Sequence, residues 1–417
     1  MTAPELMPQP EAPSQLLVVG AGIGGLALAH AWTQQPELDE HTLTVMDQAA
    51  QLTEVGAGIQ LGPNATRILK AWGLEPALKP FLTVPDGIEA LNARGQRVGW
   101  LPLGEHCQQA HGAPYWTIHR GDLHRVLLES VRSRGRVAIH LSRTLESIRC
   151  ESANPSVALK FAHHDEELQG SGLIAADGVW STVRRGHWPH SVWRDTGQVA
   201  YRTLVPMDQV PQRWQSPRVW VWMLPRMHVV AYPIDGGRTL NVVVLMARRG
   251  ERVELAWDQR PSADSLEADF VHAQHRCPSE LKALLACAPD WRVWPLVAGQ
   301  ALRGPQDMAR GVVALLGDAA HPMLPYMAQG AGMAIEDAQV LTAMAVEQAR
   351  SGALNVANLF AQYAQQRWAR CARVQRKAIR NGQWFHAVGL QAWARDLGLR
   401  AMSERVMDVP WLYQTMA

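Results

Sequence analysis

The feature that most constrains the fold of this chain is a glycine-rich turn close to the N-terminus. The run Gly20-Ala21-Gly22-Ile23-Gly24-Gly25 has the pattern G-x-G-x-x-G and follows the apolar run Leu16 to Val19. Where such a turn joins a buried strand to a helix, Gly20 permits the tight turn, Gly22 lets a pyrophosphate approach the backbone, and Gly25 lets the helix pack closely on the strand. We therefore expect a strand, this turn and a helix over Gly24 to Gln34.

An acidic residue stands at the distance from the glycines that a dinucleotide site requires. Asp47 follows a second predicted strand, Thr42 to Met46, and its carboxylate can accept hydrogen bonds from ribose hydroxyls. The helix N-terminus adds free N–H groups and the positive end of a dipole, which attract a pyrophosphate. This β-α-β unit predicts a bound dinucleotide, and by itself it does not distinguish FAD from NAD.

A second motif, far along the chain, favours FAD. Gly317-Asp318 follows another apolar run, Val312 to Leu316, and Gly330-Ala331-Gly332 opens a long helix that we expect to end near Arg350. An aspartate at a strand end can bind the hydroxyls of a polyol chain. The N–H groups at a helix start suit the anionic edge of a reduced flavin.

Between the two motifs, the pattern changes from alternating strands and helices to consecutive short strands. The strand candidates are Val199 to Val205, Val219 to Met223, Met227 to Tyr232 and Thr239 to Met246, with Asp235-Gly236-Gly237 as a hairpin turn. The predicted fold class is therefore α/β, a Rossmann-type FAD-binding domain with an inserted antiparallel-sheet substrate domain and C-terminal helices. The predicted boundaries are 14–80, 107–193 and 295–375 for the FAD-binding domain, 81–106 and 194–294 for the sheet domain, and 376–417 for the C-terminal helical segment.

Charge and composition exclude several kinds of partner. The formal net charge of the 417 residues is +2, and no block of basic residues predicts binding to nucleic acid. No uncharged apolar run reaches the roughly 18 residues of a membrane span, and the N-terminus lacks the features of a signal peptide. The five cysteines are scattered without a CxxC pattern, so we expect neither a disulfide framework nor a metal site. These observations predict a cytoplasmic protein without membrane contacts.

A group of basic residues near the C-terminus has the spacing of one helix face. Its members are Arg367, Arg370, Arg373, Arg376, Lys377 and Arg380. We interpret this group as a solvated helix face, with a binding patch as the less favoured alternative.

A histidine in the predicted sheet domain is a candidate for chemistry. Along the strand from Met227 to Tyr232, the side chains of His228, Val230 and Tyr232 share one face, because side chains alternate along a strand. From these residues alone, a half-buried structural histidine is the favoured interpretation, and a catalytic base is the alternative.

Several further motifs complete a pattern that resembles a known family. They are Glu54-Val55-Gly56-Ala57-Gly58-Ile59-Gln60, Pro63-Asn64-Ala65-Thr66, His119-Arg120-Gly121-Asp122-Leu123-His124, Ala176-Asp177-Gly178-Val179-Trp180-Ser181-Thr182-Val183-Arg184, Tyr232-Pro233 and Trp411-Leu412-Tyr413. With the two glycine-rich motifs, they resemble the single-component flavoprotein aromatic hydroxylases of the p-hydroxybenzoate hydroxylase fold. Within that fold, the chain is most similar to the group of salicylate hydroxylase, 3-hydroxybenzoate 6-hydroxylase and 6-hydroxynicotinate 3-monooxygenase. The resemblance covers nearly the whole chain and leaves the substrate open.

The resemblance implies a set of cofactor contacts. It implies that the ADP half of FAD is held by Gly20, Gly22, Gly25 and Asp47, and that Arg120 lies between the two halves of the cofactor. It also implies that Asp318 binds the ribityl chain and that the flavin ring faces the backbone of Gly330, Ala331 and Gly332. By the same resemblance, Asp177 serves both FAD and NADH or NADPH. Asp47 stands where the family more often has glutamate, and the shorter carboxylate should still reach a ribose.

The resemblance also implies a reaction. In this reaction, NADH or NADPH and O2 are consumed to hydroxylate an aromatic substrate of the benzoate or pyridine-carboxylate type that already carries a hydroxyl group. The new oxygen enters ortho or para to that hydroxyl, through a flavin C4a-hydroperoxide. A phenol has a pKa near 10, so a base must take its proton at neutral pH, and the resemblance assigns this role to His228 with Tyr232 as its partner. Leu324, Pro325 and Tyr326 are expected to line the substrate pocket.

The expected partner is a small aromatic molecule, and the expected assembly is a monomer or a homodimer. Two alternatives remain from the sequence. One is an FAD oxidase or dehydrogenase without oxygen insertion, and the other is a non-enzymatic binding protein with an FAD-binding fold.

Overall fold

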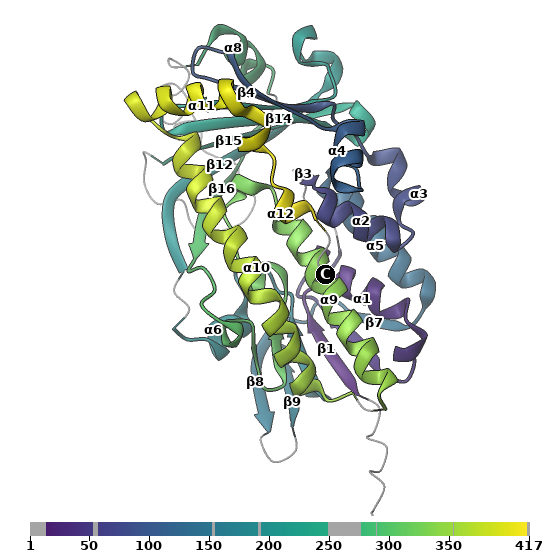
Figure 1. Cartoon of the computed structure of the whole chain (residues 1–417). Helices are drawn as coiled ribbons and strands as arrows, with labels where there is room; N and C mark the ends of the chain where they lie inside the picture. Colours follow the sequence, from purple (N-terminus) through teal and green to yellow (C-terminus); the bar gives the residue numbers. More distant parts are fainter. Residues whose placement is uncertain are drawn as a thin grey trace, which may run out of the picture.

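The computed structural model describes residues 14–52, 57–151, 155–190, 193–248, 277–288, 290–352 and 354–414 (Figure 1). The Glu54-Val55-Gly56 part of the motif before Gly58 lies outside these residues. In Figure 1, strands β14, β15 and β12 of one sheet lie at the top and strands β1 and β7 of another lie near the bottom, while α9 and α10 run between them.

The first sheet has six strands in the order β17-β18-β11-β1-β2-β7. Their bounds are β1 Gln15–Val19, β2 Thr42–Met46, β7 Val137–His140, β11 Gly172–Ala175, β17 Ala309–Arg310 and β18 Val313–Leu315. All neighbouring pairs are parallel except the pair of β17 with β18. The central strands are continuous apolar runs whose side chains are buried, as is typical of a parallel sheet covered on both faces.

Three helices that pack together cover this sheet. They are α1 Ile23–Thr33, α5 Arg120–Arg134 and α9 Gly330–Arg350, and α1 packs against both of the others. The smaller elements around them are β3 Gly58–Leu61, α2 Pro63–Ala71, α3 Glu75–Leu78, α4 Gly104–His111, β6 Trp116–His119, β8 Leu145–Glu151, β9 Ser156–Phe161, β10 Leu168–Gly170 and α6 Thr182–His187. The pair β3 and β6 forms a small ladder, and β8, β9 and β10 form a three-stranded sheet.

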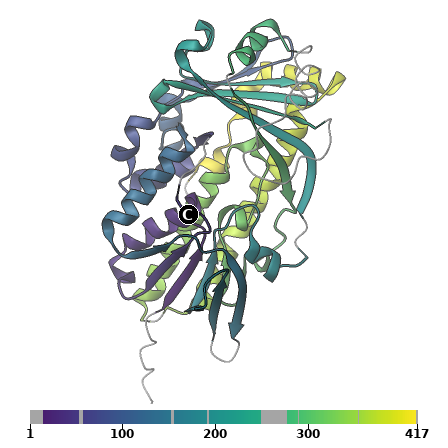
Figure 2. The same ribbon diagram turned by 180° about the vertical axis from the view of Figure 1, so that it is seen from behind.

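The second sheet has seven strands in the order β16-β12-β15-β14-β13-β4-β5. It lies in the upper part of Figure 2. Their bounds are β4 Gly87–Leu91, β5 Arg97–Pro102, β12 Trp193–Pro206, β13 Arg218–Leu224, β14 Met227–Ile234, β15 Thr239–Ala247 and β16 Arg292–Gly299. Residues 235–237 form the predicted turn, since β14 and β15 pair as an antiparallel hairpin across it. One pair, β4 with β13, is parallel, so the expectation of a wholly antiparallel sheet was wrong at this edge. The cause is topological, because the hairpin of β4 and β5 comes from an earlier part of the chain and joins the sheet beside β13.

The two faces of the second sheet differ in what covers them. Trp220, Trp222, Val229 and Ala231 point to one side and form an apolar cluster with helix α8, Ser279–Ala286. Side chains that alternate with them point to the opposite side and line a cavity. The predicted class, a Rossmann-type FAD-binding fold with an inserted sheet domain and C-terminal helices, is confirmed, while the exact domain boundaries stay a prediction.

The C-terminal helices connect the two sheets. Helix α10, Val356–Phe385, begins against the parallel sheet and ends beside the second sheet, where α11, Gly389–Met407, packs on β5 (Figure 1). The short helix α12, Pro410–Tyr413, then packs on α2. None of the helices that the structure describes has the length and apolar character needed to cross a membrane.

Candidate active site

The glycine-rich turn has the geometry that its sequence predicts. Gly20 has a φ of +108°, and a Cβ at Gly25 would lie 1.9 Å from the Gly20 carbonyl oxygen, so larger residues would break the turn. A Cβ at Gly22, by contrast, would meet no protein atom within 4 Å, which leaves the space in front of its backbone open. The Asp47 carboxylate accepts hydrogen bonds from the N–H of Ala21 at 2.7 Å and of Ala49 at 2.8 Å, and it fixes the turn from one side.

The second motif brings Asp318 and the start of α9 to the same region as α5. Asp318 follows β18, and a Cβ on Gly330 would lie 3.6 Å from its Oδ1 atom. Solvent reaches the Asp318 side chain, yet the surrounding protein desolvates the carboxyl and raises its pKa, while the positive charges of His321 and Arg120 act in the opposite direction. Arg120 is the first residue of α5, so residues from distant parts of the chain meet around this carboxylate.

A buried ion-pair network holds α9 and α10 together behind this motif. Arg367 is fully buried and donates to Asp337 at 2.6 Å and to Glu336 at 2.7 Å. Arg370 also pairs with Glu336 at 2.7 Å. The interpretation of the basic group as a solvated helix face was therefore wrong for Arg367 and Arg370, because their carboxylate partners lie on a different helix.

His321 completes this network. Its Nε2 atom lies 2.6 Å from Asp337, which also accepts the N–H of Gly317 at 2.9 Å. Burial disfavours the cationic form, but the neighbouring Cys371 and Asp337 hold the pKa of His321 well above its usual value. Ligand atoms of His321, Asp337 and Cys371 lie within 4.8 Å of one another, but Arg367 already neutralises the carboxylate, so these residues fit an ion-pair network better than a metal centre.

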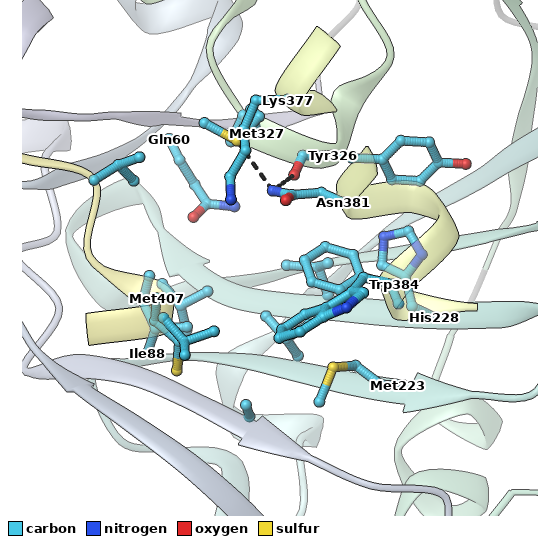
Figure 3. A pocket seen from close by; sticks show the side chains of 18 of the residues that line it. Gln60, Ile88, Met223, His228, Tyr326, Met327, Lys377, Asn381, Trp384 and Met407 are labelled. Atoms are coloured by element: carbon cyan, nitrogen blue, oxygen red, sulfur yellow. Dashed lines mark hydrogen bonds between the residues drawn. The ribbon is translucent and has the colours of Figure 1, made fainter. Parts of the chain in front are cut away.

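A cavity of about 400 Å³ lies between the second sheet and the C-terminal helices. Apolar side chains of β4, β13 and β14 form one wall, and residues of α10, α11 and the loop after Asp318 form the others. In Figure 3, Ile88, Met223 and Met407 lie on one side of the space, and Gln60, Lys377 and Asn381 lie on the other. The side chain of Asn381 donates to the Tyr326 carbonyl oxygen at 3.1 Å and so ties α10 to the loop after Asp318.

The expected pocket residues and their neighbours lie as follows. Pro325 and Tyr326 line the cavity, whereas Leu324 packs into an apolar cluster with Ala200 and Leu245. Val230 lines the cavity beside His228, as the alternation along β14 requires.

His228 is buried in the wall of this cavity with only 1% of its surface exposed. Its Nδ1 atom lies 2.8 Å from Nε2 of His386, the C-cap residue of α10, and its ring contacts the rings of Tyr326 and Phe385. Burial, and to a lesser degree the nearby His386, lowers the pKa of His228 well below 6.5. Burial also lowers the pKa of His386 to about 4. Both rings are therefore neutral at neutral pH, and a neutral imidazole can accept a proton.

Tyr232 lies farther along the same face of β14. Its hydroxyl donates to the carbonyl oxygen of Gly58 at 2.7 Å, and it does not line the cavity. A different phenol, Tyr115, lines the cavity and donates to Gln60 at 2.8 Å. Tyr232 is thus placed to position the strand that carries Gln60.

Comparison with known proteins agrees with this geometry. Residues 14–378 match the model of a family described as the FAD binding domain. The chain is 35% identical to the 3-hydroxybenzoate 6-hydroxylase of Polaromonas naphthalenivorans, over 95% of each chain. It is 36% identical to the 3-amino-4-hydroxybenzoate 2-monooxygenase of Streptomyces cremeus, over 96% of this chain and 94% of that one.

The chain belongs to this FAD-binding family. Its fold is also that of Klebsiella pneumoniae HpxO, solved with FAD and uric acid, with a TM-score of 0.79 over 94% of this chain and 95% of that one, at 22% identity. The protein is an FAD-dependent aromatic-ring monooxygenase that uses NADH or NADPH as electron donor.

The residues of this monooxygenase fit the FAD that the family binds. The carboxylate oxygen Oδ1 of Asp177 and the amide oxygen Oδ1 of Asn64 are buried, and neither has a hydrogen-bond partner among the described residues. The other oxygen of Asp177 accepts the N–H groups of Thr182 at 2.8 Å and Val183 at 3.3 Å. Asn64 lies beside the first turn of α9, where its Nδ2 donates to Gln329 at 3.0 Å. Buried polar atoms are rarely left unpaired, so these acceptors indicate a ligand with donor groups.

Some residues of this monooxygenase's site were missed from the sequence. Tyr115 and His386 carried no local motif, because their roles depend on contacts with β3 and β14. Lys377 belonged to the basic group that the sequence placed on a solvated helix face, but it lines the cavity. Outside the cavity wall, a sequence signal also existed for Arg202, which interacts electrostatically with Tyr232 and Arg120. It is an arginine within the apolar run Val199 to Val205, and its Nε atom is buried without a hydrogen-bond partner among the described residues.

Proposed function

We propose that His228 is the base through which this monooxygenase activates the hydroxyl group of its aromatic substrate. The observation that carries this proposal is a buried, neutral histidine in the wall of an apolar cavity, with its Nδ1 atom engaged by a second histidine. In the proposed arrangement, Nδ1–H of His228 donates to His386. The lone pair on Nε2 is then free to accept the substrate proton, because the hydrogen bond fixes both the tautomer and the ring orientation.

A phenolate ring attacks an electrophilic oxygen far better than a phenol does. The apolar walls, including Ile88, Val221 and Val230, exclude water from the ring that reacts. The proton can leave the site through His386, which lies nearer the surface than His228. Tyr232 contributes indirectly in this proposal, by holding the backbone of Gly58 two residues before Gln60.

The cofactor site is proposed on the residues that the two motifs bring together. Gly20, Gly22, Gly25 and Asp47 would hold the ADP half of FAD. Arg120, Asp177 and Asp318 would hold its middle, and the N–H groups of Gly330, Ala331 and Gly332 would face the flavin ring. FAD, reduced by NADH or NADPH, supplies the activation of oxygen when it is bound. The open space at Gly22 and the unpaired oxygens of Asp177 and Asn64 support this placement.

The proposed substrate is a hydroxylated benzoate or pyridine carboxylate, with the new oxygen entering ortho or para to its hydroxyl. Two relatives of this chain are named for hydroxylated benzoates, and the name 3-hydroxybenzoate 6-hydroxylase places the new oxygen para to the hydroxyl. The cavity has the apolar wall that an aromatic ring requires, and polar side chains at its edges can orient the substrate.

A panel of hydroxybenzoates and hydroxypyridine carboxylates tests this proposal. We expect at least one of them to stimulate NADH or NADPH oxidation and to yield a hydroxylated product by mass spectrometry, in amounts close to the nucleotide consumed. If every compound that stimulates oxidation gives only hydrogen peroxide, the protein is an oxidase and the proposal is wrong.

A further inference from the structure

Helix α10 places two cations on the wall of the cavity. Lys377 and Arg380 stand one helical turn apart and both line the cavity, next to Asn381. No aspartate or glutamate is found among the residues described as lining this space. The charged groups of the pocket are therefore positive, which favours an anionic ligand.

These two cations differ from the other basic residues of α10 in their partners. Arg367 and Arg370 are matched by Glu336 and Asp337. Lys377 and Arg380 have neither a hydrogen bond nor an ion pair to any residue that the structure describes. Lys377 is partly buried, and its pKa is lowered by this burial and by the charge of Arg380. Arg380 is exposed, so solvent screens part of the repulsion between the two cations, and an anion bound between them would relieve the rest.

The two cations and His228 lie at different ends of the cavity. His386, the partner of His228, follows Arg380 by six positions, which is a rise of roughly 9 Å along a helix at about 1.5 Å per residue. Helical side chains also incline toward the N-terminus, which carries the cations farther from His228. Figure 3 shows Lys377 on the Gln60 side of the cavity, away from His228.

We propose that Lys377 and Arg380 form an anion subsite that binds the carboxylate of the substrate while its hydroxyl meets His228. This inference rests on the proposed function and adds a geometric rule to it. The carboxylate and the hydroxyl must lie apart on the ring, so meta- and para-hydroxylated acids fit the pocket, and ortho acids such as salicylate fit poorly.

The test compares binding of acids with that of their neutral amides. The variants are Lys377→Gln, Arg380→Gln and the double variant. The control is Arg376→Gln, because Arg376 is exposed on the same helix and does not line the cavity. Calorimetric titration with 3-hydroxybenzoate, 4-hydroxybenzoate, salicylate, 3-hydroxybenzamide and 4-hydroxybenzamide gives the affinities, and FAD content confirms the fold of each variant.

We expect the double variant to bind 3- or 4-hydroxybenzoate roughly ten- to a hundredfold more weakly, as when hydrogen bonds to a charged group are lost. Binding of the two amides, the KM for NADH or NADPH and the behaviour of the Arg376→Gln control should stay unchanged. The wild-type protein should bind at least one of the two separated acids more tightly than salicylate.

Three results would overturn the subsite. They are an equal loss of affinity for acids and amides, a loss confined to NADH or NADPH, and wild-type binding of amides without binding of acids. In the last case, hydroxylation of an amide would leave the proposed role of His228 intact but would contradict the proposed carboxylate substrate. If no ring compound stimulates NAD(P)H oxidation by the wild-type protein, the proposed function fails, and the inference fails with it.

Discussion

Two fully buried histidines of this protein have opposite protonation behaviour. His321 lies 2.6 Å from the Asp337 carboxylate, and its pKa is held well above 6.5 despite burial. His228 is surrounded by the rings of Tyr326, Phe385 and His386, and burial lowers its pKa well below 6.5. Both rings are buried, so the difference comes from their neighbours: anionic groups outweigh the effect of burial at His321, and none opposes it at His228.

The same contrast extends to the two regions around these histidines. Around His321, charged residues such as Asp337, Glu336 and Arg367 neutralise one another, and the network joins α9 to α10. Around His228, polar groups are few and face a cavity. Substitutions in the first region should therefore affect folding and FAD binding, and substitutions in the second should affect the reaction.

The largest effect on stability is expected for Arg367→Met. This change leaves Asp337 and Glu336 buried with less compensating charge, and loss of one partner of a buried pair typically costs about 3–5 kcal/mol. Denaturant unfolding of the FAD-loaded protein measures the loss, with Arg376→Met as the exposed control on the same helix. Equal stability of the two variants would show that the network contributes little.

A smaller effect is expected for Asp318→Ala. The proposed loss of a hydrogen bond from the ribityl chain to a carboxylate should weaken FAD binding by roughly 1.5–3 kcal/mol. Fluorescence titration of the apoprotein with FAD measures it, and Asp86→Ala serves as an exposed acidic control. An unchanged affinity would remove Asp318 from the cofactor site.

The pH dependence of stability sharpens the comparison of the two histidines. Below pH 6.5 an unfolded histidine binds a proton that folded His228 does not, so the free energy of unfolding should fall by about 1.4 kcal/mol per pH unit for this group. Folded His321 has a raised pKa and is protonated in both states below pH 6.5, so its stabilisation is lost only on the alkaline side.

Unfolding of wild type, His228→Gln and His321→Gln between pH 6.5 and 5 measures this difference. The fall of the free energy of unfolding with decreasing pH should be less steep in His228→Gln and should be unchanged in His321→Gln. A less steep fall in His321→Gln and an unchanged fall in His228→Gln would show that His321 is the neutral histidine and His228 the charged one.

The smallest effect is expected for Tyr232→Phe. It removes one buried hydrogen bond to Gly58, worth about 0.5–1.5 kcal/mol of stability, and should slow hydroxylation less than a change at His228 does. Tyr363→Phe removes a comparable bond to Leu315 in the other region and should leave the yield of product unchanged. A similar loss of product in both variants would argue against a link from Tyr232 to the pocket.

Local patterns predicted much of this fold. Strand β2 and helix α9 lie where the sequence places them, because continuous apolar runs and small residues at a helix start are determined by near neighbours. The glycine turn was predictable for the same reason, since Gly20 and Gly25 constrain one another within a few residues.

Contacts between distant residues could not be predicted in this way. Arg367 resembled a surface residue because its partners lie about thirty positions earlier, on α9. His228 and His386 are 158 residues apart, and no spacing rule joins them. The parallel pairing of β4 with β13 likewise depends on topology and leaves no local signal.

The most direct test of the central claim is the yield of hydroxylated product per NAD(P)H consumed by His228→Gln. We expect the variant to keep FAD and most of its flavin reduction, while hydroxylation falls about 10²–10⁴-fold and hydrogen peroxide appears instead. Raising the pH toward the pKa of the substrate hydroxyl should restore part of the yield, because solvent then supplies the phenolate. Near-normal yield at neutral pH would contradict the claim and leave His228 as a structural residue of β14.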